Sequence, residues 1–278
     1  MDLKLAIPFT VPVLGEAYSS LNNPVLFAAL DFFTHVRLTG RPADAPRLPV
    51  SSPPLRRALT RALIKIGARE DLSLVSQVSD RIENDFLATA AIISAYRLHE
   101  SPAELIHALS LPDDRSFLTL SRAMNAISGG FTVVRRGEGA VSLEGGIDAA
   151  FHLSLRKARS RVKASLEAFS TSYPELAQPT WHLVGHIVLE GGRMVREGDP
   201  ERLGKLMAME AGVSYALGVL ETRDLKPAYP PEECFASKPI RSEIMTGELI
   251  LAPRETLPLP NFTRLNPTQE GIVEDDHG

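Results

Sequence analysis

Two histidines and a glutamate recur every four residues on one stretch of the chain, at His182, His186 and Glu190. On a helix this spacing places two imidazoles and a carboxylate on one face, where they could bind a metal ion. Leucine, valine and isoleucine occupy positions between them. This pattern favours histidines that are part of an ordinary amphipathic helix and bind no metal. The sequence therefore predicts no metal site.

A basic run near the middle of the chain could contact an anionic substrate. Its members are Arg156, Lys157, Arg159, Arg161 and Lys163. We expect them on a solvated helix face, and we expect Arg135 and Arg136 to be solvated in a turn. Cys234, the only cysteine, has no neighbouring His or Asp that would make it a nucleophile. The sequence contains no P-loop or Rossmann fingerprint.

Composition restricts the class of protein that could carry such groups. Of the 278 residues 44% are hydrophobic, and 30 Lys and Arg oppose 34 Asp and Glu, as in a globular protein. A net charge of −4 gives no long-range attraction to nucleic acid, so any phosphate chemistry must come from a local site. No signal peptide is recognisable, and no apolar run reaches the ~18 residues of a membrane span. We expect a cytoplasmic protein that binds neither nucleic acid nor membranes.

Hydrophobic periodicity predicts strands and helices in alternation over the first half. A strand at residues 3–8 and an apolar run at 25–36, broken at Asp31, form a strand-turn-strand opening. The small residues of 85–98 predict a helix that packs closely against a sheet. The other expected elements are a proline-rich loop at 41–54, a helix at 55–66, a strand at 72–78, and helices at 101–110 and 114–127.

The second half begins with a hairpin and continues mostly as helix. Residues 131–134 and 140–143 form the hairpin, and a domain boundary follows near 145–152. The other expected elements are helices at 153–170, 174–196 and 200–222, a strand at 248–252, and a tail whose last residues are frayed. The predicted fold class is α+β with two domains.

Three motifs, in their order and spacing, resemble the GHMP small-molecule kinases, and mevalonate kinases most. The first is IPFTVPVLGEA followed by PVLFAALD, at residues 7–17 and 24–31. The second is NAISGGF at 125–131, and the third combines GD, LGKLM and LGV between Gly198 and Val219. The resemblance implies an N-terminal ribosomal-protein-S5-like domain at 1–150 and a C-terminal ferredoxin-like domain at 151–278. Nucleotide and substrate would lie in the cleft between them.

The chain retains the scaffold residues of the family motifs and lacks their reactive residues. Family members place P-x-G-A-G-L-G-S-S-A before the central helix, so that backbone amides can hold phosphate. The segment 79–88 has no glycine here, and its carboxylates Asp80, Glu83 and Asp85 would repel phosphate. Phe86 and Leu87 replace the serines that would hold magnesium. We expect a capped helix instead, with Asp85 or Asn84 as its N-cap.

Five residues match the family's active-site motifs and are the candidate site. The family's catalytic aspartate corresponds to Arg122 without a gap, or to Met124 or Asn125 with one. Thr10 replaces the lysine of the opening motif. Lys238 begins the C-terminal loop, which retains one glycine, and Glu16 belongs to the opening motif. We expect Arg122 or Lys238 to bind an anion, Asn125 and Thr10 to hydrogen-bond it, and Glu16 to be structural.

Two functions remain open at this point. The first is a diverged protein that no longer transfers phosphate and acts as a binding or partner subunit, in a homo-oligomer or beside an active paralogue. The alternative is a divergent ATP-dependent phosphotransferase of isoprenoid-precursor (mevalonate) metabolism. Mg-ATP is implied only by the second function, whereas a small-molecule ligand in the interdomain cleft is compatible with both.

Overall fold

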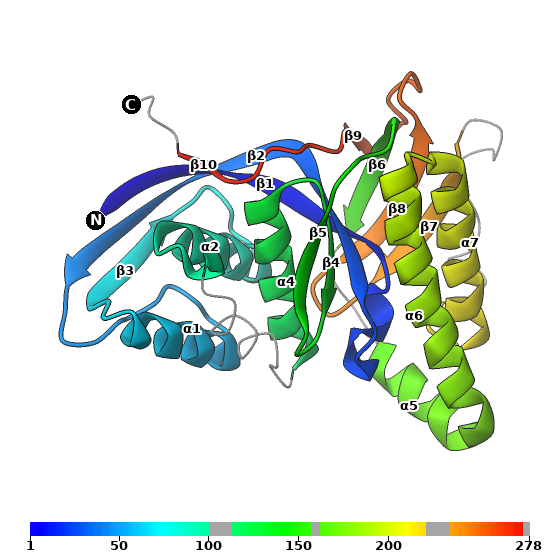
Figure 1. Cartoon of the computed structure of the whole chain (residues 1–278), viewed down its shortest axis with the longest axis horizontal. Helices are drawn as coiled ribbons and strands as arrows, with labels where there is room; N and C mark the ends of the chain where they lie inside the picture. The colour runs from blue at the N-terminus through cyan, green and yellow to red at the C-terminus, as the bar shows by residue number, and fades with distance from the viewer. Residues whose placement is uncertain (101–112, 157–161, 221–233, 275–278) are drawn as a thin grey trace.

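The computed structural model describes residues 1–100, 113–156, 162–220 and 234–274. Two antiparallel sheets and six α-helices make up this part of the chain (Figure 1). The strands are β1 (Asp2–Leu14), β2 (Val25–Pro42), β3 (Glu70–Val75), β4 (Phe131–Arg135), β5 (Gly139–Leu143), β6 (Ala149–Arg156), β7 (Ala236–Arg241), β8 (Thr246–Pro253), β9 (Thr263–Leu265) and β10 (Val273–Glu274). The α-helices are α1 (Pro53–Lys65), α2 (Arg81–Ala95), α4 (Asp114–Ser128), α5 (Val162–Ser172), α6 (Pro174–Glu197) and α7 (Pro200–Ala216), with 3-10 turns at Glu16–Leu21 and Leu98–Glu100.

The first sheet has the order β10-β1-β2-β4-β5, with β3 also paired to β2. Successive side chains of a strand point to opposite faces, and β4 shows what each face meets. Thr132 hydrogen-bonds to Asn125 of α4, whereas Val133 lies beside Gly192 of α6. Helices therefore cover both faces of this sheet.

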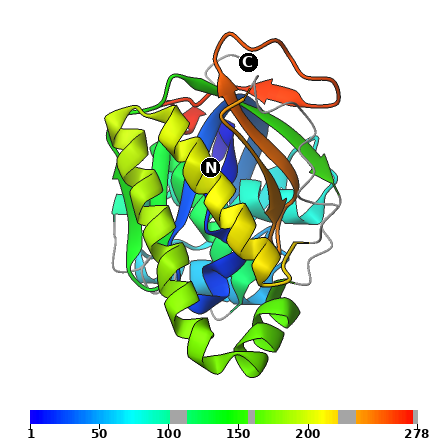
Figure 2. The same cartoon turned by 90° about the vertical axis from the view of Figure 1, so that its right-hand side faces the viewer.

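The second sheet has the order β7-β8-β6-β9 and packs with the C-terminal helices. Figure 2 shows α6 and α7 side by side, with β7 beside α7. One continuous core joins the two sheets, since it includes Ile7 and Leu30 of the first and Phe151 and Leu249 of the second. The fold class is the predicted α+β. None of the helices described here is long and apolar enough to cross a membrane.

Most elements of the first half agree with the sequence. The central helix is buried from Asp85 to Ile93, and α4 and the β4–β5 hairpin lie where expected. The helix begins at Arg81 with Asp80 as its N-cap, so the assignment of the cap to Asp85 or Asn84 was wrong. The helix expected at 101–110 lies outside the described residues.

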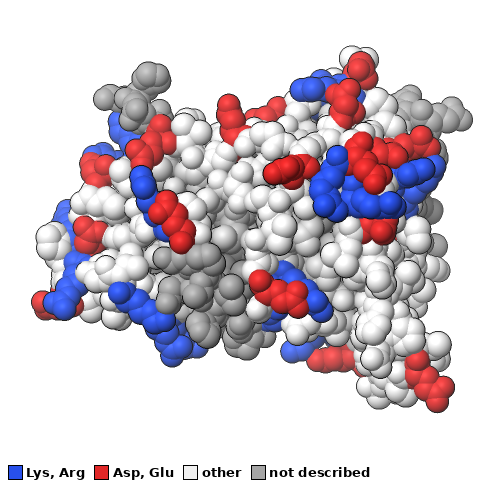
Figure 3. Space-filling model, viewed as in Figure 1, with Lys and Arg blue, Asp and Glu red and all other residues white. Residues whose placement is uncertain are grey.

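Charged side chains of both signs are dispersed over the face in Figure 3, with basic ones gathered where α1 lies.

The second half requires three corrections. Residues 153–156 belong to strand β6, not to the expected helix. The tail is not frayed before residue 275, because Val273 pairs with Ala6 of β1 as part of β10. Arg136 is not solvated: its side chain is 12% exposed, pairs with Asp114 at 2.5 Å and lies 4.7 Å from the Phe117 ring centre. The proposed division at residue 150 stays a prediction, and β10 returns to the first sheet across it.

Two residues of the resemblance motifs have plain structural roles. Gly15 adopts φ 87°, and a Cβ there would lie 2.3 Å from the Pro24 carbonyl oxygen, so only glycine fits the turn. Asp31 accepts hydrogen bonds at 2.7 Å from both the backbone and the side-chain amide of Asn266. It thereby fixes the C-terminal segment on β2.

Candidate functional site

Arg122 of α4 is the centre of a buried cluster. Its guanidinium donates to both oxygens of the Glu83 carboxylate, at 2.8 and 3.0 Å, and its Nε donates to the Thr10 hydroxyl at 3.1 Å. The guanidinium carbon lies 4.1 Å from the centre of the Phe86 ring and 5.4 Å from that of Phe9. The Arg122 side chain is 1% exposed, and its charge is already neutralised by a bidentate carboxylate.

The loop between β3 and α2 closes on the beginning of α2. The Asp80 side chain accepts hydrogen bonds from the backbone amides of Ile82 and Glu83, at 2.9 and 3.0 Å. Asn84 accepts from the Ser76 hydroxyl at 2.6 Å and donates to the Val78 carbonyl at 2.7 Å. Donors at this helix N-terminus are thus satisfied by side chains of the chain itself.

Asp85 ties the beginning of α1 to α2. Its carboxylate accepts from the Ser51 amide and hydroxyl, both at 2.6 Å, and from the Ser52 amide at 3.2 Å. Arg115 lies 3.5 Å away and adds a positive charge. The carboxylate that the sequence placed at the phosphate position is therefore a buried structural anchor.

Lys238 was expected to begin a loop, but it lies within strand β7 and is the centre of a second buried cluster. Its ammonium donates to the Val13 carbonyl at 2.9 Å, to Glu16 at 2.9 Å and to Glu210 of α7 at 2.7 Å. The other oxygen of Glu210 accepts from the Gly15 amide at 2.9 Å. All three ammonium protons have acceptors, so this cluster joins β1, α7 and β7 and leaves no donor for an anion.

Burial dominates the protonation of this second cluster. It raises the pKa of Glu16 to about 7, although Lys238 opposes the shift. Burial alone would lower the pKa of Lys238, but the two carboxylates hold it above its ordinary value. Burial and the neighbouring Glu210 also raise the pKa of Tyr18, whose hydroxyl lies 2.5 Å from that of Ser214. With both carboxylates ionised the three charged groups would carry a net charge of −1, which disfavours anion binding.

Asn125 belongs to a third network. Its amide nitrogen donates to the Gly130 carbonyl at 3.2 Å and to the Thr132 hydroxyl at 3.0 Å. It is fully buried, and its Oδ1 has no partner among the described residues. The structure thus brings Thr10 to Arg122 and Glu16 to Lys238, and places Asn125 with neither pair.

The two residues that complete these clusters, Glu83 and Glu210, were not among the candidates. Glu210 had a recognisable pattern, because Leu203, Met207 and Ser214 share its helical spacing and all are buried. A carboxylate on such a stripe needs a cation, and Lys238 provides it. The identity of the partner depends on tertiary contacts that no spacing reveals.

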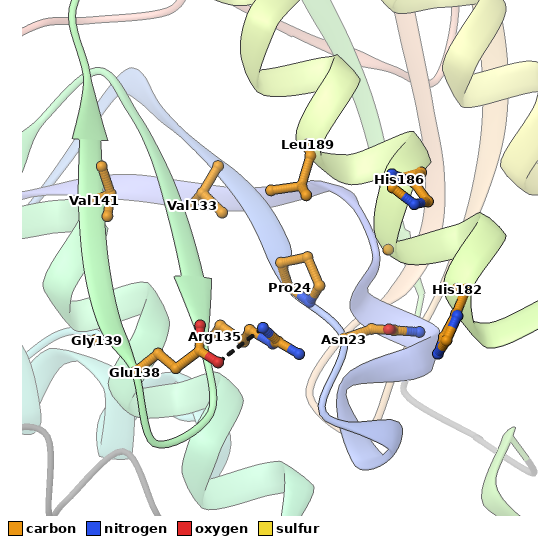
Figure 4. Close-up of a pocket in the computed structure, with 11 residues that line it drawn as sticks. Asn23, Pro24, Val133, Arg135, Glu138, Gly139, Val141, His182, His186 and Leu189 are labelled. Atoms are coloured by element: carbon orange, nitrogen blue, oxygen red, sulfur yellow. Dashed lines mark ion pairs between the residues drawn. The ribbon is translucent and has the colours of Figure 1, made fainter. Parts of the chain in front are cut away.

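His182 and His186 lie at an open pocket between α6 and the β4–β5 hairpin. Figure 4 shows both rings at the side formed by α6, and Arg135 and Glu138 paired at 2.8 Å on the hairpin. The pocket has a volume of about 400 Å³, and its other lining residues are Asn23, Pro24, Val133, Gly139, Val141, Gly185 and Leu189. No group of three metal-binding side chains occurs in the described residues.

No family model and no curated protein matches the chain, whereas solved structures match it along its whole length. Mevalonate diphosphate decarboxylase of Staphylococcus aureus superposes with a TM-score of 0.67 at 14% identity, over 99% of this chain and 98% of that one. The Lin0012 protein of Listeria innocua gives 0.68 at 13% identity, with both chains fully covered. Mevalonate kinase of Methanococcus jannaschii gives 0.61 at 11%, over 96% and 98%.

The solved structures that match this chain share one fold. Mevalonate kinase and mevalonate diphosphate decarboxylase are both GHMP-superfamily proteins. The chain described here has the GHMP kinase fold, as its sequence motifs predicted. A structural likeness at such low sequence identity shows the fold alone. The function of a fold depends on the residues of its sites.

Proposed function

We propose that this chain is a GHMP-fold protein that does not transfer phosphate and acts as a binding or partner subunit. The observation that carries the proposal is the closed N-terminus of α2. The family resemblance places a triphosphate at this helix end, held by free backbone amides of a glycine-rich loop. Here the amides of Ile82 and Glu83 already donate to Asp80.

Electrostatics supports the same conclusion. The Asp80 carboxylate occupies the place of an anion, and Glu83 and Arg122 neutralise each other. A phosphate charge about 4 Å from a carboxylate would cost about 4 kcal/mol at an effective dielectric constant of 20. Mg-ATP therefore does not fit these residues in the way that the fold family implies.

The residues for proton transfer are also different. The resemblance assigns the catalytic aspartate to the position of Arg122 or its neighbours, and Arg122 is a permanently charged cation bound to Glu83. It cannot accept a proton from a substrate hydroxyl. Asn125, buried against Thr132, cannot accept one either.

The second candidate is a divergent ATP-dependent phosphotransferase of mevalonate metabolism. Its support is the full-length likeness to mevalonate kinase and to mevalonate diphosphate decarboxylase. An L. major mevalonate kinase of the same fold was solved with R-mevalonate, at a TM-score of 0.57. This candidate requires ATP contacts at a place other than the N-terminus of α2.

One assay separates the two candidates. Purified full-length protein is incubated with radiolabelled ATP, magnesium and mevalonate, mevalonate phosphate or mevalonate diphosphate, with a mevalonate kinase as positive control. The proposal predicts no transfer or hydrolysis above the background without protein. Turnover near the ordinary enzymatic range of about 1–1,000 per second would establish the phosphotransferase instead.

A further inference from the structure

A second hollow lies far in sequence from both clusters, between α1 and the segment before it. It is lined by Pro46, Arg47, Leu48, Arg56, Arg57, Thr60 and Arg61, and has a volume of about 520 Å³. All four arginines are exposed, and none has a carboxylate within ion-pair distance among the described residues. We propose that this arginine pocket binds a small molecule that carries two or more phosphate groups.

The charge here contrasts with that of the whole protein. Residues 41–69 contain seven Arg and Lys and one acidic residue, Asp44, a local net charge of +6 in a chain whose net charge is −4. Basic side chains gather over α1 in Figure 3. Four arginines around one hollow repel one another, and an anion between them removes that repulsion.

Both walls of the arginine pocket are fixed in place. Leu55, Leu59 and Leu63 anchor α1 in the core, so the arginines project from its other side. On the opposite wall, the amide of Arg47 donates to the Glu70 carbonyl at 3.1 Å, and its carbonyl accepts from the Leu72 amide at 2.8 Å. A binder whose backbone is already ordered loses less entropy when its ligand arrives.

Size and charge define the ligand. A volume of about 520 Å³ is that of a small-molecule site, too small to enclose a polymer. A phosphate group carries about −1.5 to −2 charges near neutral pH, so two of them balance four arginines. Guanidinium groups also match phosphate oxygens with paired hydrogen bonds, which ammonium groups cannot do. The proposal does not depend on the absence of phosphotransfer.

The test is calorimetric titration of the full chain with inorganic triphosphate, pyrophosphate and orthophosphate. We expect affinity to rise in the order orthophosphate, pyrophosphate, triphosphate, and to fall with added salt. The double variant Arg57→Ala and Arg61→Ala should weaken triphosphate binding at least tenfold, and alanine preserves α1. Its matched control, Arg193→Ala with Arg202→Ala, removes the same charge from α6 and α7 and should change binding less than twofold.

Three results would overturn the proposal. The first is no triphosphate binding by the folded wild-type protein. The second is equal triphosphate binding by the wild type and the pocket variant, which would place the anion outside the arginine pocket, for example at a site for ATP. The third is a single-stranded RNA that binds through the same arginines and is not displaced by excess triphosphate, since that would identify an extended polyanion as the ligand.

Discussion

Removing Glu83 should destabilise the protein more than removing Arg122, although the two residues share one ion pair. The Arg122 side chain is 1% exposed, whereas that of Glu83 is 23% exposed. Glu83→Met leaves a buried guanidinium with only the Thr10 hydroxyl and two rings, which should cost about 3–5 kcal/mol. Arg122→Met leaves a carboxylate that can turn toward water, and the thioether can still pack on Phe86, so we expect about 1–3 kcal/mol.

The double variant Glu83→Met with Arg122→Met measures the coupling free energy of the ion pair apart from the effects of the single substitutions. With both residues replaced by methionine no buried charge is left, and stability should return to within about 1 kcal/mol of wild type. Urea unfolding of the four proteins, followed by Trp181 fluorescence and far-ultraviolet circular dichroism, measures the coupling. The exposed pair Glu201 and Lys205 is the control and should couple by about 0.3–0.5 kcal/mol. Coupling no larger than in the control, or a Glu83→Met cost below about 1 kcal/mol, would refute the reasoning.

Three further predictions concern the scaffold. Because burial raises the pKa of Glu16 from 4.5 to about 7, the folded state holds the extra proton, and stability should fall by at most about 3 kcal/mol as pH rises through that window. Urea unfolding at several pH values should show that Glu16→Gln removes this dependence and exposed Glu201→Gln does not; an unchanged slope in the first would disprove it. Gly15→Ala should cost more than about 2 kcal/mol or prevent folding, because its Cβ would lie 2.3 Å from a carbonyl oxygen, and a stable variant would contradict this. Asp31→Ala should release the C-terminal segment from Asn266, and limited proteolysis should cleave that segment faster than in wild type, with equal rates as the contrary result.

Local patterns in the sequence predicted most of the fold. The alternation of β3 and the small-residue face of α2 are properties of neighbouring residues. Both elements form, although β3 spans Glu70–Val75 where 72–78 was expected, and α2 spans Arg81–Ala95 where 85–98 was expected. Strand β10 is two residues long and exists only because Val273 meets Ala6, a pairing between opposite ends of the chain. Residues 153–156 were expected in the helix 153–170, whereas their pairing with the distant strand β8 places them in β6.

The sequence offered the candidate site as a set of positions, without the contacts between their side chains. The motifs offered Thr10, Arg122, Glu16 and Lys238 as residues that could serve a ligand in the interdomain cleft, and that role stays a prediction. All four side chains are buried. Spacing could not show that each cation faces a carboxylate, because Arg122 lies 39 residues from Glu83 and Lys238 lies 222 from Glu16. Whether a cation is free to bind an anion depends on those distant partners.

We propose that the Asp80 carboxylate closes the N-terminus of α2 to a triphosphate. The test is calorimetric titration of the wild-type protein with Mg-ATP at low salt. The titration is repeated on the Arg57→Ala and Arg61→Ala variant, so that binding in the arginine pocket is excluded. We expect this variant to bind Mg-ATP no more tightly than about 1 mM, about −4 kcal/mol, because Asp80 repels the phosphates and already accepts the hydrogen bonds of the Ile82 and Glu83 amides. A low-micromolar dissociation constant of the variant for Mg-ATP would show that the N-terminus of α2 is open to phosphate.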